Sequence, residues 1–374
     1  MARILRRALI VVVAVLVLMV SATLAPAKRP PKDPPTPLPD PTSVEVFGAW
    51  HCSNDYCTWG TVRETAEFDE QNHWLVDRGD GRPSVNVVVL AFVNPLDLLH
   101  GTTDATTLNG VPRGMTSDVV QYFTDAGVRV MVSIGGITYT DDWDAALAED
   151  AAGLGTAAAT MASTLGVGVE IDYEQNSSPD LDGLQAFIDA YRSVHPYDAS
   201  GWEPTARLTI DLAAGDRWLI SLTRTATADW LRTDTPALDY ANAMVPARQP
   251  RSAADAIANW QEHLDGKPKY APPILPLAPA KLAGSLYVAL GGRPLPECVD
   301  YAASLQAATA PFVQTATSRI AETTNGMLGF MFWAAERPAV RGVGTVPPNT
   351  CEGGLGAAAT ALAIHVPMPP LRQE

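Results

Sequence analysis

Residues 168–174 read GVEIDYE, a short run in which acidic and apolar side chains alternate. Because successive side chains along a β-strand point to opposite faces, a strand over these residues places Glu170, Asp172 and Glu174 on one face. The apolar side chains between them then share the other face, where helices can cover them. The run therefore predicts a buried strand whose acidic face looks into the interior of a sheet.

Short β-branched runs recur on both sides of this strand, and the segments between them carry helix signals. Residues 117–126 carry an apolar stripe and end at Gly127, a residue type that commonly follows a helix. Residues 178–194 carry another stripe and begin with Ser178 and Pro179, which suit the N-cap and the first helical position. The expected strands are residues 44–50, 86–93, 128–135, 168–174, 208–213, 238–245, 285–290 and 327–333.

An alternation of apolar strands with helices predicts a parallel sheet covered by helices, and eight such units are the number that closes a barrel. We therefore expect a protein of the α/β class with a single (β/α)8 TIM barrel. A doubly wound open sheet is the alternative that the same pattern allows. In a barrel the chemistry belongs at the carboxyl ends of the strands, which puts Glu174 nearest to the functional rim.

Three acidic side chains stacked in a poorly solvated interior cannot all ionise without a large free-energy cost. At least one of them should keep its proton, which means that its pKa is raised. A carboxylic acid that is still protonated near neutral pH is what the cleavage of a glycosidic bond requires from a general acid. Two alternatives remain open from these residues alone: an amphipathic strand whose acidic face meets water, and a metal site, for which alternate strand residues usually need further ligands.

Four sequence motifs fall, in order, on four of the expected strands. Residues 133–136 read SIGG, residues 167–174 read VGVEIDYE, residues 238–244 read LDYANAM and residues 329–333 read GFMFW. In this order they resemble motifs of the family 18 glycoside hydrolases (GH18), which include chitinases and certain endo-β-N-acetylglucosaminidases. The likeness spans most of residues 44–334.

The resemblance implies a mechanism in which the N-acetyl group of the substrate is the nucleophile. Glu174 then protonates the leaving oxygen and later activates water, and Asp172 orients and stabilises the acetamido group. Glu170 completes the implied set of catalytic acids. The resemblance thus implies a retaining hydrolase of β-1,4-linked N-acetylglucosamine, either chitin-like or in an N-glycan, that needs no cofactor and no metal.

The same resemblance suggests residues that contact the sugar. Trp333 ends the eighth expected strand, where the family has a Trp that floors the sugar site, and Met244 ends the motif on the sixth. Tyr139 follows the third strand closely and is a candidate for lining the cleft. We expect the partner to be an oligo- or polysaccharide that contains N-acetylglucosamine, and we expect the protein to be a monomer.

The chain departs from the family pattern at four positions. Val167 and Glu170 stand where the family usually has Asp, and Pro246 and Ala247 follow Met244 where the family has a Tyr and then an acid or amide. In the family that Tyr helps to hold the reacting acetamido group. A non-catalytic, lectin-like barrel that binds carbohydrate is therefore the alternative function.

The amino-terminal residues have the pattern of an export signal. Within residues 1–27, three arginines precede an uncharged apolar run, and residues 25–27 read APA, an A-x-A cleavage site. The apolar run is shorter than the roughly 20 residues of a spanning helix, so we expect cleavage and secretion, with an uncleaved anchor as the alternative. Residues 28–42 contain seven prolines, which predicts an extended linker. Residues 43–374 are left for the barrel domain.

Charge and cysteine content limit the partners of the exported chain. The chain carries 26 basic and 41 acidic side chains, and the leader would remove three arginines, which leaves a net charge near −18. Such a charge opposes binding to phosphate backbones, and no nucleotide-binding loop is present, so we expect neither nucleic acid nor nucleotide as a partner. Four cysteines in an exported chain predict disulfides. We favour Cys52–Cys57 and Cys298–Cys351 among the three pairings.

Overall fold

The computed structural model describes the part of the chain that forms the barrel. The described residues are 46–53, 64–77, 83, 85–213, 218–244, 253–287, 289–290, 293–294 and 327–333. Within these ranges, no helix is both long enough and apolar enough to cross a membrane. The predicted leader, the proline-rich linker, Pro246, Ala247 and the predicted disulfides lie outside the described residues, because only the backbone of Cys52 is described.

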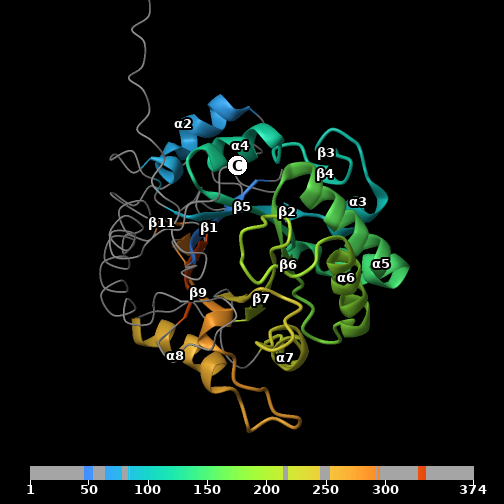
Figure 1. Ribbon diagram of the computed structural model, residues 1–374, viewed down its shortest axis with the longest axis vertical. Coiled ribbons are helices and arrows are strands. Elements are labelled where there is room, and N and C mark those ends of the chain that lie inside the picture. The colour runs from blue at the N-terminus through green and yellow to red at the C-terminus, as the bar shows by residue number, and fades with distance from the viewer. Residues whose placement is uncertain are drawn as a thin grey trace, which may run out of the picture. The chain divides into compact units, whose positions relative to one another are not determined.

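The central sheet is a closed barrel of parallel strands (Figure 1). Each strand pairs with its neighbours along the chain, and β1 pairs with both β2 and β12, so the sheet has no free edge. The closed order confirms the predicted (β/α)8 barrel and excludes the open, doubly wound sheet. The barrel strands are β1 (Val46–Cys52), β2 (Val87–Val93), β5 (Arg129–Gly135), β6 (Gly168–Asp172), β7 (Leu208–Ala213), β8 (Ala241–Met244), β9 (Leu282–Tyr287) and β12 (Gly329–Trp333).

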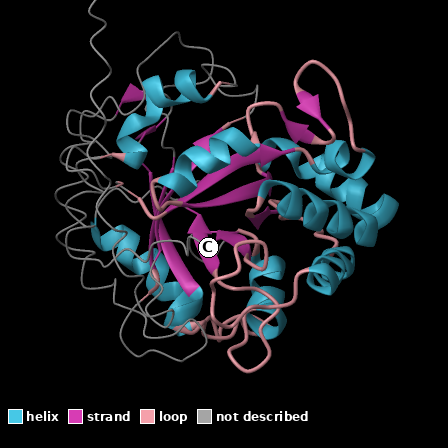
Figure 2. Cartoon of the chain, turned by 45° about the horizontal axis from the view of Figure 1, so that its top comes forward, coloured by secondary structure: helices cyan, strands magenta, loops and turns pink. Residues whose placement is uncertain are grey.

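Helices surround the strands on the outside of the barrel (Figure 2). The two predicted amphipathic helices are present, one of them ending one residue earlier than expected. The helices are α2 (Thr65–Val76), α3 (Pro95–His100), α4 (Ser117–Asp125), α5 (Thr140–Leu165), α6 (Leu181–Val194), α7 (Ile220–Thr225) and α8 (Ala253–Asp265). Shorter elements are the strand pairs β3 (Thr107–Leu108) with β4 (Val111–Pro112) and β10 (Ala289–Leu290) with β11 (Arg293–Pro294). There are also the 3-10 helices η1 (Ile137–Tyr139) and η3 (Pro279–Lys281) and the π-helix η2 (Ala226–Trp230).

The start of α6 differs from the prediction. Ser178 does not cap the helix; Asp180 does, and its carboxylate accepts a hydrogen bond of 2.9 Å from the backbone N–H of Gly183. Asp and Ser are comparable as N-caps, so the sequence signal was ambiguous by two residues. The segment before Asp180 is therefore free to form the loop that follows β6, at the functional end of the barrel.

Two apolar clusters separate the outside of the sheet from its interior. The larger one joins the outward side chains of the strands to the helices and includes Val169, Ile171 and Tyr173 of the acidic strand region. The smaller one fills the barrel interior and includes Trp50 and Met331. Because the apolar side chains of residues 168–174 belong to the outer cluster, the acidic ones point inward, as the alternation predicts.

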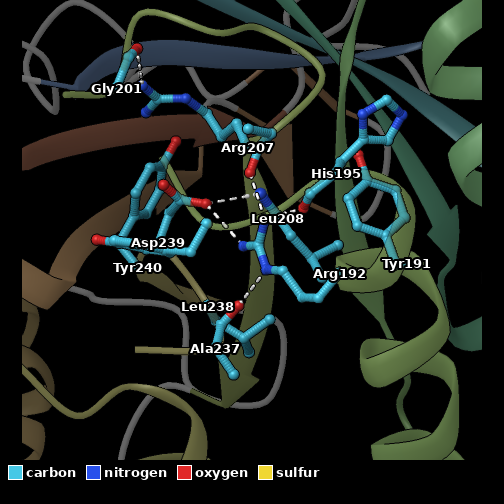
Figure 3. Close-up of polar contacts among 12 residues, drawn as sticks. Tyr191, Arg192, His195, Gly201, Arg207, Leu208, Ala237, Leu238, Asp239 and Tyr240 are labelled. Carbon is cyan, nitrogen blue, oxygen red and sulfur yellow. Dashed lines mark hydrogen bonds and ion pairs between the residues drawn. The ribbon is translucent and has the colours of Figure 1, made fainter. Parts of the chain in front are cut away.

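A polar network ties together the amino-terminal ends of β7 and β8 (Figure 3). Arg192 of α6 donates from Nε to the carbonyl of Ala237 at 2.6 Å and from Nη2 to Asp239 at 3.1 Å. The same oxygen of Asp239 accepts the backbone N–H of Leu208 at 2.8 Å. Asp239 is among the residues that were predicted to start strand six, but β8 begins only at Ala241. The network lies at the amino-terminal ends of these strands, opposite to the rim that carries Glu174.

Candidate active site

Glu170 is held at the centre of the site. Its side chain is fully buried, and its Oε1 accepts a hydrogen bond of 2.7 Å from the indole Nε1 of Trp50. Its Oε2 accepts one of 2.7 Å from Nδ2 of Asn242 on β8. Burial raises the pKa of Glu170 to about 7, and these two hydrogen bonds oppose that rise. The extra methylene of Glu relative to the family's Asp is thus accommodated with partners for both oxygens.

Glu174 lies two residues beyond the end of β6, at the carboxyl rim of the barrel. Its side chain is 6% exposed, and burial raises its pKa to about 7, against an opposing hydrogen bond from the backbone N–H of Ile137. Oε2 of Glu174 has no hydrogen-bond partner among the described residues. Glu174 is therefore a buried acid that titrates near neutral pH and has one oxygen available to a ligand.

Asp172 lies between these two acids on β6. Burial raises its pKa well above the usual value, and the charges of Glu174 and then Glu170 raise it further. Its Oδ1 is another carboxylate oxygen that has no partner within the described ranges. The three acids predicted from the sequence thus share one buried site, in which their like charges prevent simultaneous ionisation.

The remaining predicted residues are buried near the carboxyl ends of other strands. Met244 ends β8 and is 7% exposed, and Tyr139 ends η1 and is 6% exposed. The backbone of Trp333 ends β12 and pairs with Tyr287 of β9, but its side chain is outside the described atoms. The roles of these three residues in sugar binding stay predictions.

Comparison with known proteins gives matches in structure only. No family model matches the sequence, and a search of curated proteins finds no match. A GH18 chitinase from Pseudoalteromonas aurantia superposes with a TM-score of 0.52 at 14% identity, over 85% of this chain and 99% of that one. A chitinase from Rhizomucor miehei gives a TM-score of 0.51 at 14% identity, over 85% of this chain and 100% of that one. The fold resembles that of family 18 chitinases. At this identity the likeness establishes the fold and leaves the activity to be argued from the site.

The chitinase-like barrel holds a fourth buried acid that the sequence reasoning missed. Asp211 of β7 is 2% exposed, and its backbone is in register with Asn242 of β8. Burial raises its pKa well above the usual value, and the charge of Glu170 and then that of Asp172 add to the rise. The available signal was the inward position of Asp211 on a strand whose outward residues, such as Ile210, are apolar.

Two further residues also belong to the site without having been predicted as part of it. Trp50 and Asn242 are the hydrogen-bond donors to Glu170.

Val167, which departs from the family pattern, lies in the cluster under the helices rather than among the acids. Within the ranges that the structure describes, no group of three or more His, Cys, Asp or Glu side chains is arranged to hold a metal ion.

The raised pKa of Glu170 predicts how its replacement changes stability with pH. A carboxyl group whose pKa is higher in the folded state stabilises the fold fully below its unfolded value, near 4.5, and loses that contribution as pH rises through about 7. The variant Glu170→Gln has no carboxyl group at this position and therefore lacks this pH-dependent contribution to stability. Relative to the original protein, it should therefore gain about 2 kcal/mol in the free energy of unfolding between pH 5 and pH 8, measured by urea unfolding.

The comparison must be made as a difference between the two proteins, because another buried group titrates in the opposite sense. Burial lowers the pKa of His263 to about 4, so its contribution is lost as pH falls through the range from 6.5 to 4. His263 is unchanged in both proteins, and its contribution cancels in the difference. A difference in unfolding free energy that stays constant from pH 5 to pH 8 would show that Glu170 does not hold a proton in the fold.

Proposed function

We propose that the chain is a secreted glycoside hydrolase that cleaves β-1,4-linked N-acetylglucosamine in oligo- or polysaccharides, with retention of configuration. The observation that carries the proposal is Glu174, a buried acid at the carboxyl rim of the barrel with a raised pKa and an oxygen without a partner among the described residues. Asp172 lies two residues earlier with its own unpartnered oxygen within the same ranges. The chitinase fold supports the substrate class.

In the proposed reaction, Glu174 acts first as an acid and then as a base. Its carboxyl proton passes to the glycosidic oxygen as the bond from that oxygen to C1 breaks. The carbonyl oxygen of the substrate's 2-acetamido group forms the new bond to C1, and the carboxylate of Asp172 stabilises the positive charge that develops on that group. The ionised Glu174 then takes a proton from the water that attacks C1, which restores both the acetamido group and the acid.

The four-acid cluster supports these protonation states. The charge of Glu170 raises the pKa of both Asp172 and Asp211, and the charge of Asp172 raises that of Asp211, so the cluster resists full ionisation. A positive charge that develops beside Asp172 during the reaction favours the carboxylate form of Asp172, which in turn stabilises that charge. The site therefore favours a cationic transition state over a neutral ground state, which is the difference in binding that catalysis needs.

A non-catalytic carbohydrate-binding barrel is the second candidate, and one observation favours it. Pro246 and Ala247 replace the Tyr and the acid or amide that the family carries after Met244. A hydrolase without that Tyr needs another donor for the acetamido carbonyl oxygen. The carboxylic acids of the cluster support the hydrolase, because a protein that only binds sugar has no need for a buried, protonated acid at the rim.

The test is hydrolysis of a fluorogenic series of N-acetylchitooligosaccharides by the purified protein, with binding measured in parallel by calorimetry. We expect turnover, products that retain the β-configuration in their first-formed NMR spectrum, and a kcat/KM that declines as pH rises above about 7, where Glu174 loses its proton. Binding without turnover on these sugars and on N-glycans would establish the lectin-like function instead. Inverted products would exclude the acetamido nucleophile.

A further inference from the structure

The proton donor Glu174 lies where the strand no longer holds the backbone. The pairing of β6 with β5 ends at Asp172, which is in register with Gly135. The carbonyl of Asp172 still accepts the N–H of Gly136 at 2.9 Å. Residues 173–175 follow without belonging to any strand, so side-chain contacts must fix the direction in which Glu174 points.

One carboxylate binds the residues on both sides of Glu174. The hydroxyl of Tyr173 donates to Oδ1 of Asp144 at 2.5 Å, and Nε2 of Gln175 donates to Oδ2 of Asp144 at 2.6 Å. Hydrogen bonds to an ionised acceptor are shorter and stronger than those between neutral groups. Two such bonds from positions i−1 and i+1 restrain the backbone around Glu174 at two points and leave its own side chain free on the opposite face.

Rigid neighbours hold this attachment in place. Asp144 belongs to α5, next to Trp143, which is fully buried and packs against the Tyr173 ring with centroids 5.6 Å apart. The indole of Trp143 donates to the carbonyl of Ile134 on β5 at 3.2 Å. The hydroxyl of Tyr173 also accepts the N–H of Asp180, the N-cap of α6, at 2.9 Å. The attachment therefore joins β5, α5 and α6 to the segment that carries Glu174.

A second contact ties the same loop to the next strand unit. Asn176 accepts the backbone N–H of Leu219 through its Oδ1 at 2.7 Å. Leu219 has a φ of 51° and directly precedes α7, the helix after β7. A left-handed φ is uncommon for a Leu side chain and needs support from its surroundings. The loop after β6 is thus held from two sides. Asp144 binds it from α5, and the backbone N–H of Leu219 binds it from the segment before α7.

We propose that Asp144 is a positioning residue that aims Glu174 at the scissile bond by binding Tyr173 and Gln175 at the same time. The effect of this positioning on the reaction rate rests on the proposed function, in which Glu174 is the general acid. A reacting group misplaced by about 1 Å can lose on the order of 100-fold in rate, so loss of the attachment should lower the rate and leave sugar binding largely intact.

The experiment compares Asp144→Ala with Asp142→Ala, a matched control on the same helix. Asp142 also accepts a side-chain amide, Nδ2 of Asn94 at 2.7 Å, but Asn94 caps α3 instead of flanking the acid. Two readouts are taken from each protein. The first is kcat and KM on N-acetylchitooligosaccharides, and the second is the titration of the Glu174 carboxyl by 13C NMR with side-chain-labelled glutamate.

For Asp144→Ala we expect kcat to fall about 10- to 100-fold with KM within about threefold of the original value. We also expect the pKa of Glu174 to fall by about one unit or more, because a loosened segment admits water to a carboxyl group whose pKa is raised by burial. In Asp142→Ala, kcat and the pKa of Glu174 should stay unchanged, even if this variant melts at as low a temperature as Asp144→Ala.

The second readout does not need turnover, which separates this proposal from the proposed function. If the original protein hydrolyses none of the sugars, the hydrolase is excluded, and the titration of Glu174 still decides whether Asp144 positions it. If Asp144→Ala fails to fold, Tyr173→Phe removes one of the two attachments and should shift both quantities in the same direction by less. An unchanged kcat and an unchanged Glu174 pKa in a folded variant would overturn the proposal.

Discussion

Replacing Glu174 with Gln should lower kcat on N-acetylchitooligosaccharides by about 10²- to 10⁴-fold, the range that a positioned general acid contributes. Gln keeps the shape of the side chain and can still accept the N–H of Ile137, but it cannot donate a proton to the glycosidic oxygen. The sugar should bind with a similar Kd, because the substitution removes proton transfer rather than a surface. Initial rates and calorimetric titrations with the same oligosaccharide measure the two effects.

The control for this substitution is Glu149→Gln. Glu149 is an exposed residue on α5 that pairs with His100 at 3.0 Å, and its loss should change kcat by less than about twofold. The decline of rate with rising pH gives an independent check, since a reaction that depends on the Glu174 proton loses it above about pH 7. A Glu174→Gln protein that retains a tenth of the original kcat would assign the proton donation to another residue.

The sequence predicted the barrel because the strands carry their information locally. Runs such as residues 87–93 are apolar over their full length and rich in Val, which is typical of strands buried on both faces. Strand boundaries were less predictable where local signals were weak. The seventh expected strand, residues 285–290, is in fact β9, Leu282–Tyr287, since Ala283 and Gly284 have low β-propensity and do not mark a strand by themselves.

The candidate site was predictable only where its residues share one strand. The alternation along residues 168–174 was sufficient to place three acids on one face, and the structure brings all three into one buried site. Alternation along β7 indicates only that Asp211 points inward; that Asp211 joins the site, and that Asp144 matters at all, depends on neighbours from other elements. Asp211 of β7 meets Glu170 of the neighbouring strand β6, and Asp144 of α5 meets Tyr173 of the segment that follows β6.

Gly135 of the SIGG motif lies where the backbone leaves no room for a side chain, beside the strand end that carries the acids. Gly135 has a φ of +115°, and a Cβ built there would lie 2.1 Å from the carbonyl oxygen of Asp172 and 2.2 Å from Nε1 of Trp143. Side chains of L-residues avoid that φ, and both close atoms belong to parts of the molecule that are buried and hydrogen-bonded. The absence of a side chain at Gly135 therefore permits β5 to approach the end of β6 closely enough to place Asp172 and Glu174.

Gly135→Ala should consequently lower the free energy of unfolding by about 4 kcal/mol or more, in the range of exceptional single substitutions, and abolish hydrolysis in whatever fraction still folds. Gly166→Ala is the matched control. Gly166 also has a positive φ, of +69°, but a Cβ there would meet nothing within 4 Å, so only the cost of the backbone conformation, about 1 kcal/mol, should appear. Urea unfolding of both variants separates the steric effect from the conformational one. Equal destabilisation by the two substitutions would mean that β5 and β6 can move apart without loss, and that the close approach at Gly135 is not what places the acids.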